Sequence, residues 1–231
     1  MPNKRTTNEL DEDEDDELQS SKRQRVRRAP LLSAINALPE YWDDPNYKGK
    51  SEQKAGSDSV SVTLGPNACN ARSNDADPDL PEGIELARKT YPECNFKAGH
   101  MRNCDLGGNG KNWKNLTILT SSANTAMTKY DNALKRAAEQ LKKVYESIYK
   151  DFPEVTERDL KDIEFGIDLE IRTEGTWGKS APDSYICNKV KYSARIHGDV
   201  PDEYQSRDVL SAMKAVKDEI GKCNGKSVDN K

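Results

Sequence analysis

The stretch between residues 122 and 150 restricts the fold more than any other part of the sequence. Apolar residues recur there at steps of three and four, the spacing of one face of an α-helix. The first turn offers Ser121 or Ser122 as a cap, and Phe152 with Pro153 is expected to end the helix. The chain must therefore supply an apolar surface that covers this face. The repeating residues are Ala126, Met127, Tyr130, Ala133, Leu134, Ala137, Leu141, Val144, Tyr145 and Ile148.

Shorter patterns around this helix predict strands and two further helices. Alternating apolar and polar residues are typical of a half-buried strand, and a preceding proline or a long amphipathic stretch favours a helix. Strands are expected at 59–64, 163–171 and 190–196, and helices at 82–91 and 206–221. The last two strands are expected to pair. The sequence therefore predicts an α+β fold with a small mixed or antiparallel sheet, the long helix, and a C-terminal strand pair plus helix.

Two dense charge blocks mark the start of the chain. Residues 11–17 read DEDEDDE and residues 22–28 read KRQRVRR. Such blocks repel themselves and offer nothing apolar to bury, so residues 1–29 are expected to form a disordered tail. The basic block resembles a nuclear localisation signal and predicts a nuclear import receptor as partner, although a solvated tail without an address has the same composition. Its basic residues are Lys22, Arg23, Arg25, Arg27 and Arg28.

The remaining composition narrows the compartment and the partners. No apolar run is long enough to cross a bilayer, and the first residues carry no secretory signal, so we expect no membrane partner and no export. Five cysteines at wide spacings fit free thiols in a reducing compartment. The net charge of -4 argues against a polyanion. Residues 84–150, however, hold twelve bases against six acids, which predicts a nucleic-acid surface there.

Only two histidines are present, and one of them lies in a distinctive segment. His197 follows a predicted strand and is expected at the surface. Residues 96–124 read FKAGHMRNCDLGGNGKNWKNLTILTSSAN. They predict a strand ending at His100, a glycine-rich loop, a second strand at 116–119, and a helix whose first turn contains Asn124. Strand, loop, strand and helix is the order of a ββα-metal finger, which places a histidine and a helical oxygen ligand on opposite sides of a scissile phosphate.

This segment resembles the DNA/RNA non-specific endonucleases of the His-Me finger superfamily. It is similar to their compact versions in bacterial polymorphic toxins and injected effectors. The resemblance is firm over residues 96–132, looser over 59–93 and the strand pair, and absent from the tail. The matching residues are Gly99, His100, Asn103, Leu106, Gly107, Gly108, Gly110, Asn115, Leu116, Thr117 and Asn124.

The resemblance implies an Mg²⁺-dependent endonuclease that hydrolyses phosphodiester bonds of DNA, RNA or both. His100 would be the general base, Asn115 would fix the finger, and Asn124 would hold the ion, with Mn²⁺ or Ca²⁺ as alternatives. A metal-bound water would be held by Asp131 or Asn132. The resemblance also implies a toxin or effector acting in a host nucleus, with secretion machinery and an immunity protein as partners.

One departure from the family pattern affects how phosphate is held. Many relatives carry an arginine before Gly-His, whereas this chain reads Lys97, Ala98, Gly99, His100. Lys97 or Arg102 is expected to replace it. A second expectation places the contact at Lys111 or Lys114, beside Trp113, which either stacks on a base or packs against the finger.

Two other functions fit parts of the pattern. A non-catalytic nucleic-acid or chromatin-binding protein could keep the fold and lack the missing arginine. A structural zinc site at Cys94, His100 and Cys104 would need a fourth ligand from a distant cysteine. For the domain plan, we expect a linker or N-terminal extension at 30–56, a nuclease-like domain at 57–222 with its finger core at 95–150, and a C-terminal tail at 223–231.

Overall fold

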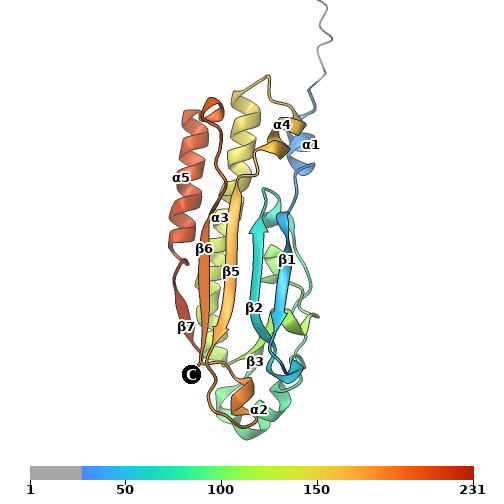
Figure 1. Ribbon diagram of the computed structural model, residues 1–231, viewed down its shortest axis with the longest axis vertical. Coiled ribbons are helices and arrows are strands. Elements are labelled where there is room, and N and C mark those ends of the chain that lie inside the picture. The colour runs from blue at the N-terminus through green and yellow to red at the C-terminus, as the bar shows by residue number, and fades with distance from the viewer. Residues whose placement is uncertain (1–27) are drawn as a thin grey trace, which may run out of the picture.

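The computed structural model describes residues 28–231 and has the expected α+β fold (Figure 1). Five antiparallel strands form one sheet in the order β1-β2-β5-β6-β7, and β3 and β4 form a separate two-stranded sheet. The helices are α1 (Leu31–Asn36), α2 (Ile84–Thr90), α3 (Ser121–Asp151), α4 (Glu157–Asp162) and α5 (Arg207–Gly221). The strands are β1 (Tyr41–Gly49), β2 (Ser57–Leu64), β3 (Lys97–His100), β4 (Leu116–Leu119), β5 (Gly166–Glu174), β6 (Lys189–His197) and β7 (Ser227–Asp229).

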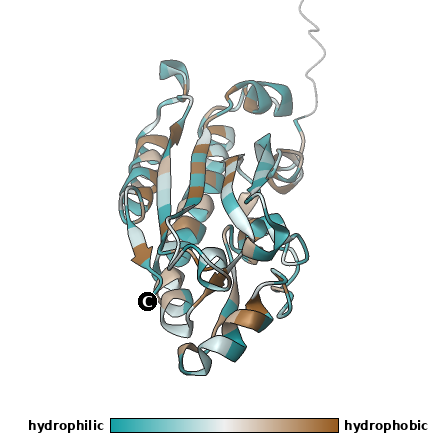
Figure 2. Cartoon of the chain, turned by 60° about the horizontal axis from the view of Figure 1, so that its bottom comes forward, coloured by the Kyte–Doolittle hydropathy of each residue, from teal (hydrophilic) through white to brown (hydrophobic). Residues whose placement is uncertain are grey.

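Helix α3 is the long helix that the apolar spacing predicted, and it runs behind the five-stranded sheet in the view of Figure 1. Its stripe is buried against the sheet and against α5, and Leu141, Val144 and Tyr145 are fully covered. Hydrophobic and hydrophilic residues alternate along the central strands in Figure 2, as expected for a sheet with one covered face. Burying each large apolar side chain contributes roughly 1.5–3 kcal/mol, so this contact stabilises the fold strongly.

The predicted cap of α3 was wrong by one residue. Thr120 caps the helix, and its side chain accepts a hydrogen bond from the backbone N–H of Ala123 at 3.2 Å. Ser121 and Ser122 lie inside the first turn instead. The reason is that β4 ends at Leu119, which leaves Thr120 as the single extended residue between strand and helix. The other end is as expected, since Phe152 is the C-cap.

Strands β5 and β6 pair along their whole length, which confirms the predicted strand pair. Strand β5 begins at Gly166 rather than at residue 163, because Ile163 caps α4 and Glu164 has a positive φ of 45°. A left-handed residue breaks the extended backbone, so the alternation at 163–165 belongs to a turn.

Parts of residues 30–56 and 223–231 lie in the five-stranded sheet, namely β1 and β7, so neither segment is only a linker or a tail. Strand β1 pairs with β2 along one edge, and β7 pairs with β6 along the other. Strand β1 gave no alternating pattern because it contains Pro45 and its register shifts three times. The boundaries expected at 57 and 222 therefore fall within one folded unit.

The two-stranded sheet lies at the lower end of the molecule in Figure 1, close to α2. His100 at the end of β3 pairs with Leu116 at the start of β4, and α3 follows directly. Beneath this sheet is a separate small core of Ile84, Ala87, Phe96, Ile118 and Ile186. The order strand, loop, strand, helix is therefore present, which we call the finger unit (residues 97–151). Across residues 28–231, no helix is both long and apolar enough to span a membrane.

Candidate active site around His100

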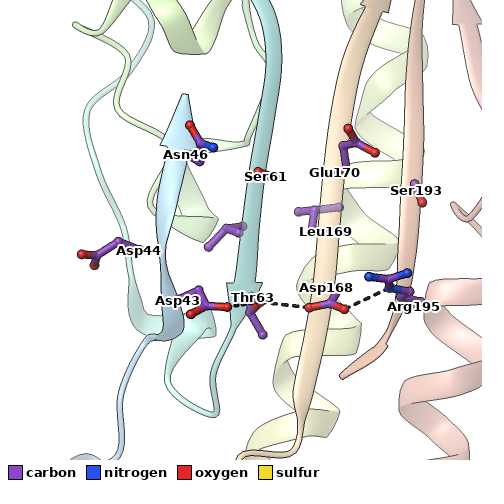
Figure 3. Close-up of a pocket in the computed structure, with 11 residues that line it drawn as sticks. Asp43, Asp44, Asn46, Ser61, Thr63, Asp168, Leu169, Glu170, Ser193 and Arg195 are labelled. Atoms are coloured by element: carbon purple, nitrogen blue, oxygen red, sulfur yellow. Dashed lines mark hydrogen bonds and ion pairs between the residues drawn. The ribbon is translucent and has the colours of Figure 1, made fainter. Parts of the chain in front are cut away.

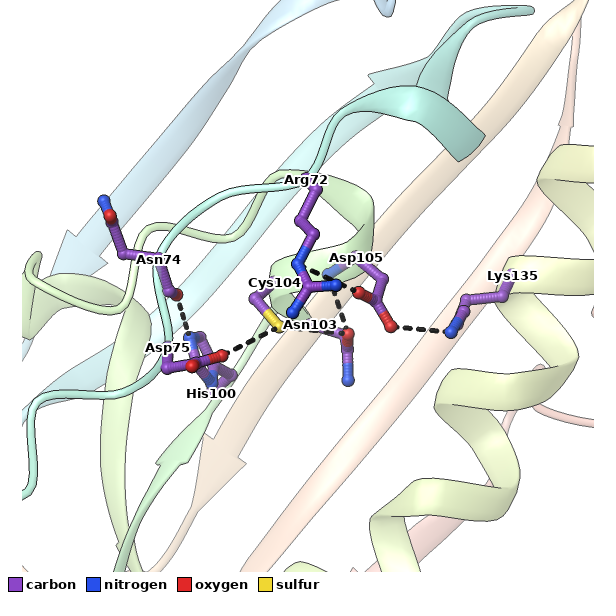
Figure 4. Close-up of polar contacts among 8 residues, drawn as sticks. All are labelled: Arg72, Asn74, Asp75, His100, Asn103, Cys104, Asp105 and Lys135. Carbon is purple, nitrogen blue, oxygen red and sulfur yellow. Dashed lines mark hydrogen bonds and ion pairs between the residues drawn. The ribbon is translucent and has the colours of Figure 1, made fainter.

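His100 is half-buried at the end of β3, and one of its ring nitrogens has a defined partner. Nε2 lies 3.1 Å from the backbone carbonyl oxygen of Asn74 (Figure 4). A carbonyl oxygen can only accept, so Nε2 carries the hydrogen in this arrangement. The neutral ring then has its lone pair on Nδ1. The tautomer that this contact selects leaves Nδ1 able to take a proton from water.

The surroundings also favour the neutral ring. Burial lowers the pKa of His100 below its usual 6.5, and this outweighs the Asn74 carbonyl and the nearby Asp75 carboxylate, which both raise it. His100 is therefore mostly unprotonated at neutral pH, which is the state that a general base needs.

The residue that contacts the His100 ring, Asn74, lies in a loop for which the sequence predicted no function. Asn74 and Asp75 pack tightly against the glycine-rich loop of the finger unit, and a Cβ at Gly110 would lie only 2.0 Å from the Asp75 carbonyl oxygen. The N–H of Asp77 also donates to Gly110 O at 2.8 Å. Gly110 is therefore needed for close approach of the two loops. No motif marks residue 74, because the contact uses its backbone rather than its side chain.

Asn115 is fully buried directly before β4 and binds the backbone of the loop. Its Oδ1 accepts from the N–H of Arg102 at 3.0 Å, and its Nδ2 donates to Arg102 O at 3.1 Å and to Asn109 O at 3.3 Å. These bonds join β4 to the residue two positions after His100. The geometry matches a side chain that fixes the loop.

Asn124 lies in the first turn of α3 and is exposed. Its Oδ1 would be 3.2 Å from a Cβ placed on Gly99, so the amide oxygen lies beside the residue that precedes His100. The same Cβ would be 2.2 Å from Leu119 Cδ1, which explains why glycine occupies this position. An exposed amide oxygen is a donor that Mg²⁺ accepts.

Asp131 and Asn132 do not join Asn124. Asp131 is buried, and its carboxylate oxygens accept from Asn103 Nδ2 at 3.1 Å and from the Tyr192 hydroxyl at 3.2 Å. Burial raises the pKa of Asp131 to about 6, although both donors lower it. Asn132 is exposed, but a step of eight residues turns it about 80° from Asn124 around the helix. The expectation that either residue holds a metal-bound water finds no geometric support.

Arg102 is not available to hold phosphate, which corrects the expectation from the sequence. Its side chain is 2% exposed and donates through Nη2 to the Tyr47 hydroxyl and, at 2.8 Å, to Gly107 O. The guanidinium also lies 4.9 Å from the centroid of the Tyr41 ring. The chain turns inward after β3, so this cation ties the finger loop to β1 instead of facing solvent.

Other basic side chains at this end are exposed. Lys111 and Lys114 lie on the loop between β3 and β4. Lys97 lies on β3, where strand alternation places it on the face of Gly99 and the Asn124 amide, opposite to that of His100. Arg72 was missed by the sequence reasoning. Its side chain is 73% exposed, and its Nε lies 3.9 Å from Asp105 Oδ1, whose partner oxygen binds Lys135 at 2.6 Å (Figure 4). A lone arginine in an irregular loop gives no pattern that could have marked it.

Trp113 packs on β1 rather than on the finger unit. A Cβ at Gly49 would lie 2.2 Å from its ring carbon Cη2. The Lys114 ammonium lies 5.7 Å from the ring centroid. The half-buried ring therefore has one face on β1.

The zinc expectation lacks a complete ligand set. Across residues 28–231 no three His, Cys, Asp or Glu side chains are grouped so as to hold a metal ion. Cys94 and Cys104 are free thiols, and Cys104 Sγ lies 3.9 Å from Asp75 Oδ1. The set Cys94, His100 and Cys104 is not assembled.

Most of the predicted nuclear-localisation residues, namely Lys22, Arg23, Arg25 and Arg27, lie outside the described part of the chain. Arg28 is described, and it contacts the folded domain. Its guanidinium carbon lies 3.6 Å from the centroid of the Tyr149 ring, and Nη2 donates to Phe152 O at 3.1 Å.

His197 lies in a different environment, on the open face of the five-stranded sheet. Its Nδ1 is 3.0 Å from Asp168 Oδ1, and Arg195 Nε is 3.0 Å from Asp168 Oδ2. The expectation of a surface residue is met only in part, since the side chain is 32% exposed. A shallow cavity of about 390 Å³ lies beside this cluster (Figure 3). It is lined by four carboxylates and one cation, namely Asp43, Asp44, Asp168, Glu170 and Arg195, so it disfavours a phosphate.

Comparison of the chain with protein-family models, with curated proteins and with solved structures finds no match.

Proposed function

We propose that this protein is an Mg²⁺-dependent endonuclease that hydrolyses phosphodiester bonds of DNA, RNA or both. One observation carries the proposal, namely the orientation of His100. Its Nε2 faces the Asn74 carbonyl oxygen, which leaves Nδ1 free, and the Asn124 amide oxygen lies beside the preceding glycine. A base and a hard oxygen ligand on adjacent elements are the two protein groups that this reaction needs.

In this proposal His100 accepts a proton from the water that attacks phosphorus. Proton transfer to a positioned base contributes typically ~10²–10⁴ in rate. The lowered pKa of His100 keeps Nδ1 unprotonated at neutral pH. Asn115 keeps the loop after His100 in place through its two bonds to the Arg102 backbone.

Asn124 would hold the ion through Oδ1. Mg²⁺ keeps several waters and needs few protein ligands when substrate phosphate completes its shell, so one amide oxygen suits this ion. When bound, the ion would stabilise negative charge on the phosphate and on the departing oxygen. Mn²⁺ or Ca²⁺ could occupy the same oxygen site.

Arg72, Lys111 and Lys114 are the exposed cations that we propose for holding the nucleic-acid backbone. Arg72 takes the role first expected of Arg102, because its guanidinium faces solvent and its contact with Asp105 is long. Phosphate contacts of this kind position a substrate without reading its sequence, which fits a nuclease of low specificity.

Incubation of plasmid DNA and of RNA with the purified protein and Mg²⁺ tests the proposal. We expect cleavage that EDTA abolishes. Asn124→Ala should reduce it by about 100-fold or more, since loss of a group that only orients a metal ligand already costs ~10–100-fold. The matched variant Asn132→Ala, about two turns further along α3 and also exposed, should not reduce it. Equal cleavage by both variants, or no cleavage by the parent protein with any divalent ion, would contradict the proposal.

A non-catalytic nucleic-acid-binding or chromatin-binding protein is the second candidate. The observation that favours it is the lack of an arginine before Gly99, together with the burial of Arg102. In that case a gel shift would persist in EDTA and no divalent ion would produce cleavage.

We also propose a nuclear site of action, reached through the basic run at 22–28 and an import receptor. We further propose delivery as a toxin or effector, with secretion machinery and an immunity protein as partners, on the basis of the resemblance of residues 96–132 to compact toxin and effector endonucleases. Replacing Lys22 and Arg23 by Ala in a fluorescent fusion of the full chain should move it from the nucleus to the cytosol. Unchanged nuclear signal would count against this address.

A further inference from the structure

We infer that Asn230 is the positioning residue for the proposed metal ligand Asn124. Asn230 follows β7 and is fully buried, and its side chain has four polar contacts. Nδ2 donates to Ile118 O at 2.9 Å and to Cys187 O at 3.0 Å, and also lies 3.8 Å from Cys187 Sγ. Oδ1 accepts from the backbone N–H of Thr120 at 2.7 Å. The inference rests on the proposed function, because it assigns a role to a residue near that site.

The Asn230 amide completes the outer edge of β4. One edge of β4 pairs with β3, which carries His100. On the other side, Ile118 O and Thr120 N would have no strand to bind, and the Asn230 side chain satisfies both. The side-chain amide thus makes the two hydrogen bonds that a neighbouring strand would make at this edge. It joins β4 of the finger unit to the loop that leads into β6 through Cys187 O.

The backbone of Asn230 is held as firmly as its side chain. Its N–H donates to Asn188 O at 2.8 Å, and its carbonyl oxygen accepts from Trp177 Nε1 at 2.7 Å. The next residue contributes as well, because Lys231 O accepts from Thr120 Oγ1 at 3.2 Å and from Ser122 Oγ at 3.3 Å. The segment 227–231 therefore closes over the corner between β4 and α3.

This corner determines where Asn124 lies. The backbone N–H of Thr120 donates to the Asn230 side chain, and Thr120 is also the N-cap of α3. The N–H of Asn124 in turn donates to Thr120 O at 3.0 Å. The position of Thr120 therefore sets the first turn of the helix, and with it the Asn124 amide oxygen beside Gly99. Without the Asn230 amide, two buried polar groups of β4 and Thr120 would lose their partners, and the first turn would open more readily.

Asn230→Ala in the full-length protein tests the inference, with Val228→Ala as the matched control. Val228 is buried in β7 two residues earlier, so its variant removes apolar packing from the same segment but keeps the Asn230 amide and its hydrogen bonds. Amide hydrogen exchange is measured at residues 120–125 and, for reference, at residues 134–141 in the middle of α3. Mn²⁺ binding is measured by titration without nucleic acid, and the Mn²⁺ concentration for half-maximal cleavage is measured alongside it.

For Asn230→Ala we expect at least about tenfold faster exchange at 120–125 with no change at 134–141. The Mn²⁺ requirement should rise about 10–100-fold, as when a group that orients a metal ligand is lost, and added Mn²⁺ should restore the maximal rate. Val228→Ala should show neither effect. If the alanine variant does not fold, Asn230→Ser keeps one donor at this position and is expected to give intermediate values.

Two results would overturn the inference. One is unchanged exchange at 120–125, and the other is faster exchange with a Mn²⁺ requirement equal to that of Val228→Ala. A parent protein that neither cleaves nor binds Mn²⁺ would instead overturn the proposed function and remove the metal part of the inference. The exchange result alone would then decide whether Asn230 holds the corner.

Discussion

The two histidines of this chain lie in comparable positions at two different regions, and their oxygen partners distinguish them. Each is the last residue of a strand and is partly buried, and in each ring one nitrogen lies about 3 Å from an oxygen. His100 faces the neutral carbonyl of Asn74 through Nε2, whereas His197 faces the Asp168 carboxylate through Nδ1. The first contact leaves an unprotonated Nδ1 for chemistry. The second places the ring in an ion-pair cluster that already contains Arg195.

The charged residues near the two histidines also differ, with bases near His100 and carboxylates near His197. Exposed bases surround the finger unit, including Arg72, Lys111 and Lys114. The charged residues that line the cavity on the open face of the sheet are mainly carboxylates, as Figure 3 shows. A phosphate backbone would be attracted to one region and repelled from the other. The comparison teaches that ring orientation and local charge, rather than the presence of a histidine, separate a candidate base from a structural residue.

The largest expected effect separates the two histidines directly. His100→Ala should lower the rate of plasmid cleavage ~10²–10⁴-fold, the usual contribution of a general base, while His197→Ala should stay within about threefold of the parent. The parent's rate should also fall as the pH drops below the pKa of His100, which burial places below 6.5, because protonation removes the lone pair. Initial rates between pH 5 and 8 measure both. Equal losses in the two variants would erase the distinction between the regions.

The second prediction compares Asp131, beside the finger loop, with Asp168 on the sheet. The pKa of Asp131 is raised to about 6 by burial, so ionisation costs the folded state about 3 kcal/mol at neutral pH, using ~1.4 kcal/mol per pH unit. Its stabilising effect is present below pH 4 and is lost as the pH rises toward 6. Burial tends to raise the pKa of Asp168, but Arg195, Thr63 and His197 together lower it, so its contribution is present at neutral pH and is lost on acidification below about pH 4.

Urea unfolding between pH 3 and 7.5 measures this difference. Asp131→Asn should be more stable than the parent at pH 7 and should lose the decline between pH 4 and 6, since the Tyr192 hydroxyl can accept from the new amide. Asp168→Asn should be less stable at pH 7 and should differ least from the parent at pH 3. A parent protein whose stability does not change between pH 4 and 6 would contradict the raised pKa of Asp131.

The sequence predicted the elements that carry their own periodicity better than the rest of the molecule. The helix at 121–151 and the pairing of β5 with β6 follow from local periodicity, which the residues carry themselves. Strand β1 does not, because Pro45 and three register shifts remove its alternation, and its position depends on tertiary contacts with β2, Arg102 and Trp113.

Within the candidate site, the sequence named side chains but could not name backbone groups or distant partners. The Asn74 carbonyl that orients His100 cannot be recognised from the type of residue 74. The contact of Arg72 with Asp105, 33 positions later in the chain, cannot be recognised from residue type either. Arg102 shows the opposite failure. Its type and spacing fit a phosphate contact, but burial against Tyr41 and Tyr47 is a tertiary property that no local pattern reports.

A smaller effect is expected for the two arginines. Arg72→Ala should raise KM for nucleic acid about tenfold, equivalent to ~1.4 kcal/mol, with little change in kcat, because an exposed guanidinium contributes to binding rather than to proton transfer. Arg195→Ala removes an equally exposed guanidinium that is paired with Asp168. It should leave KM unchanged. A rise in KM for Arg195→Ala alone would place nucleic acid on the sheet face and reverse the comparison.

The smallest expected effect concerns Lys111, on the glycine-rich loop, and Lys191, on the open sheet face. Lys111 is exposed, whereas the Lys191 ammonium lies 2.9 Å from Glu174 Oε1 and is partly neutralised. Lys111→Ala should weaken binding about two- to threefold and reduce the slope of log K against log salt by about 1, since one phosphate contact and its released counterion are lost. Lys191→Ala should change neither. Binding of a fluorescent oligonucleotide in EDTA, where no cleavage is expected, measures the slope between 50 and 200 mM salt. An unchanged slope for Lys111→Ala would show that this loop does not contact the backbone, and the positive surface would then reduce to Arg72 and Lys114.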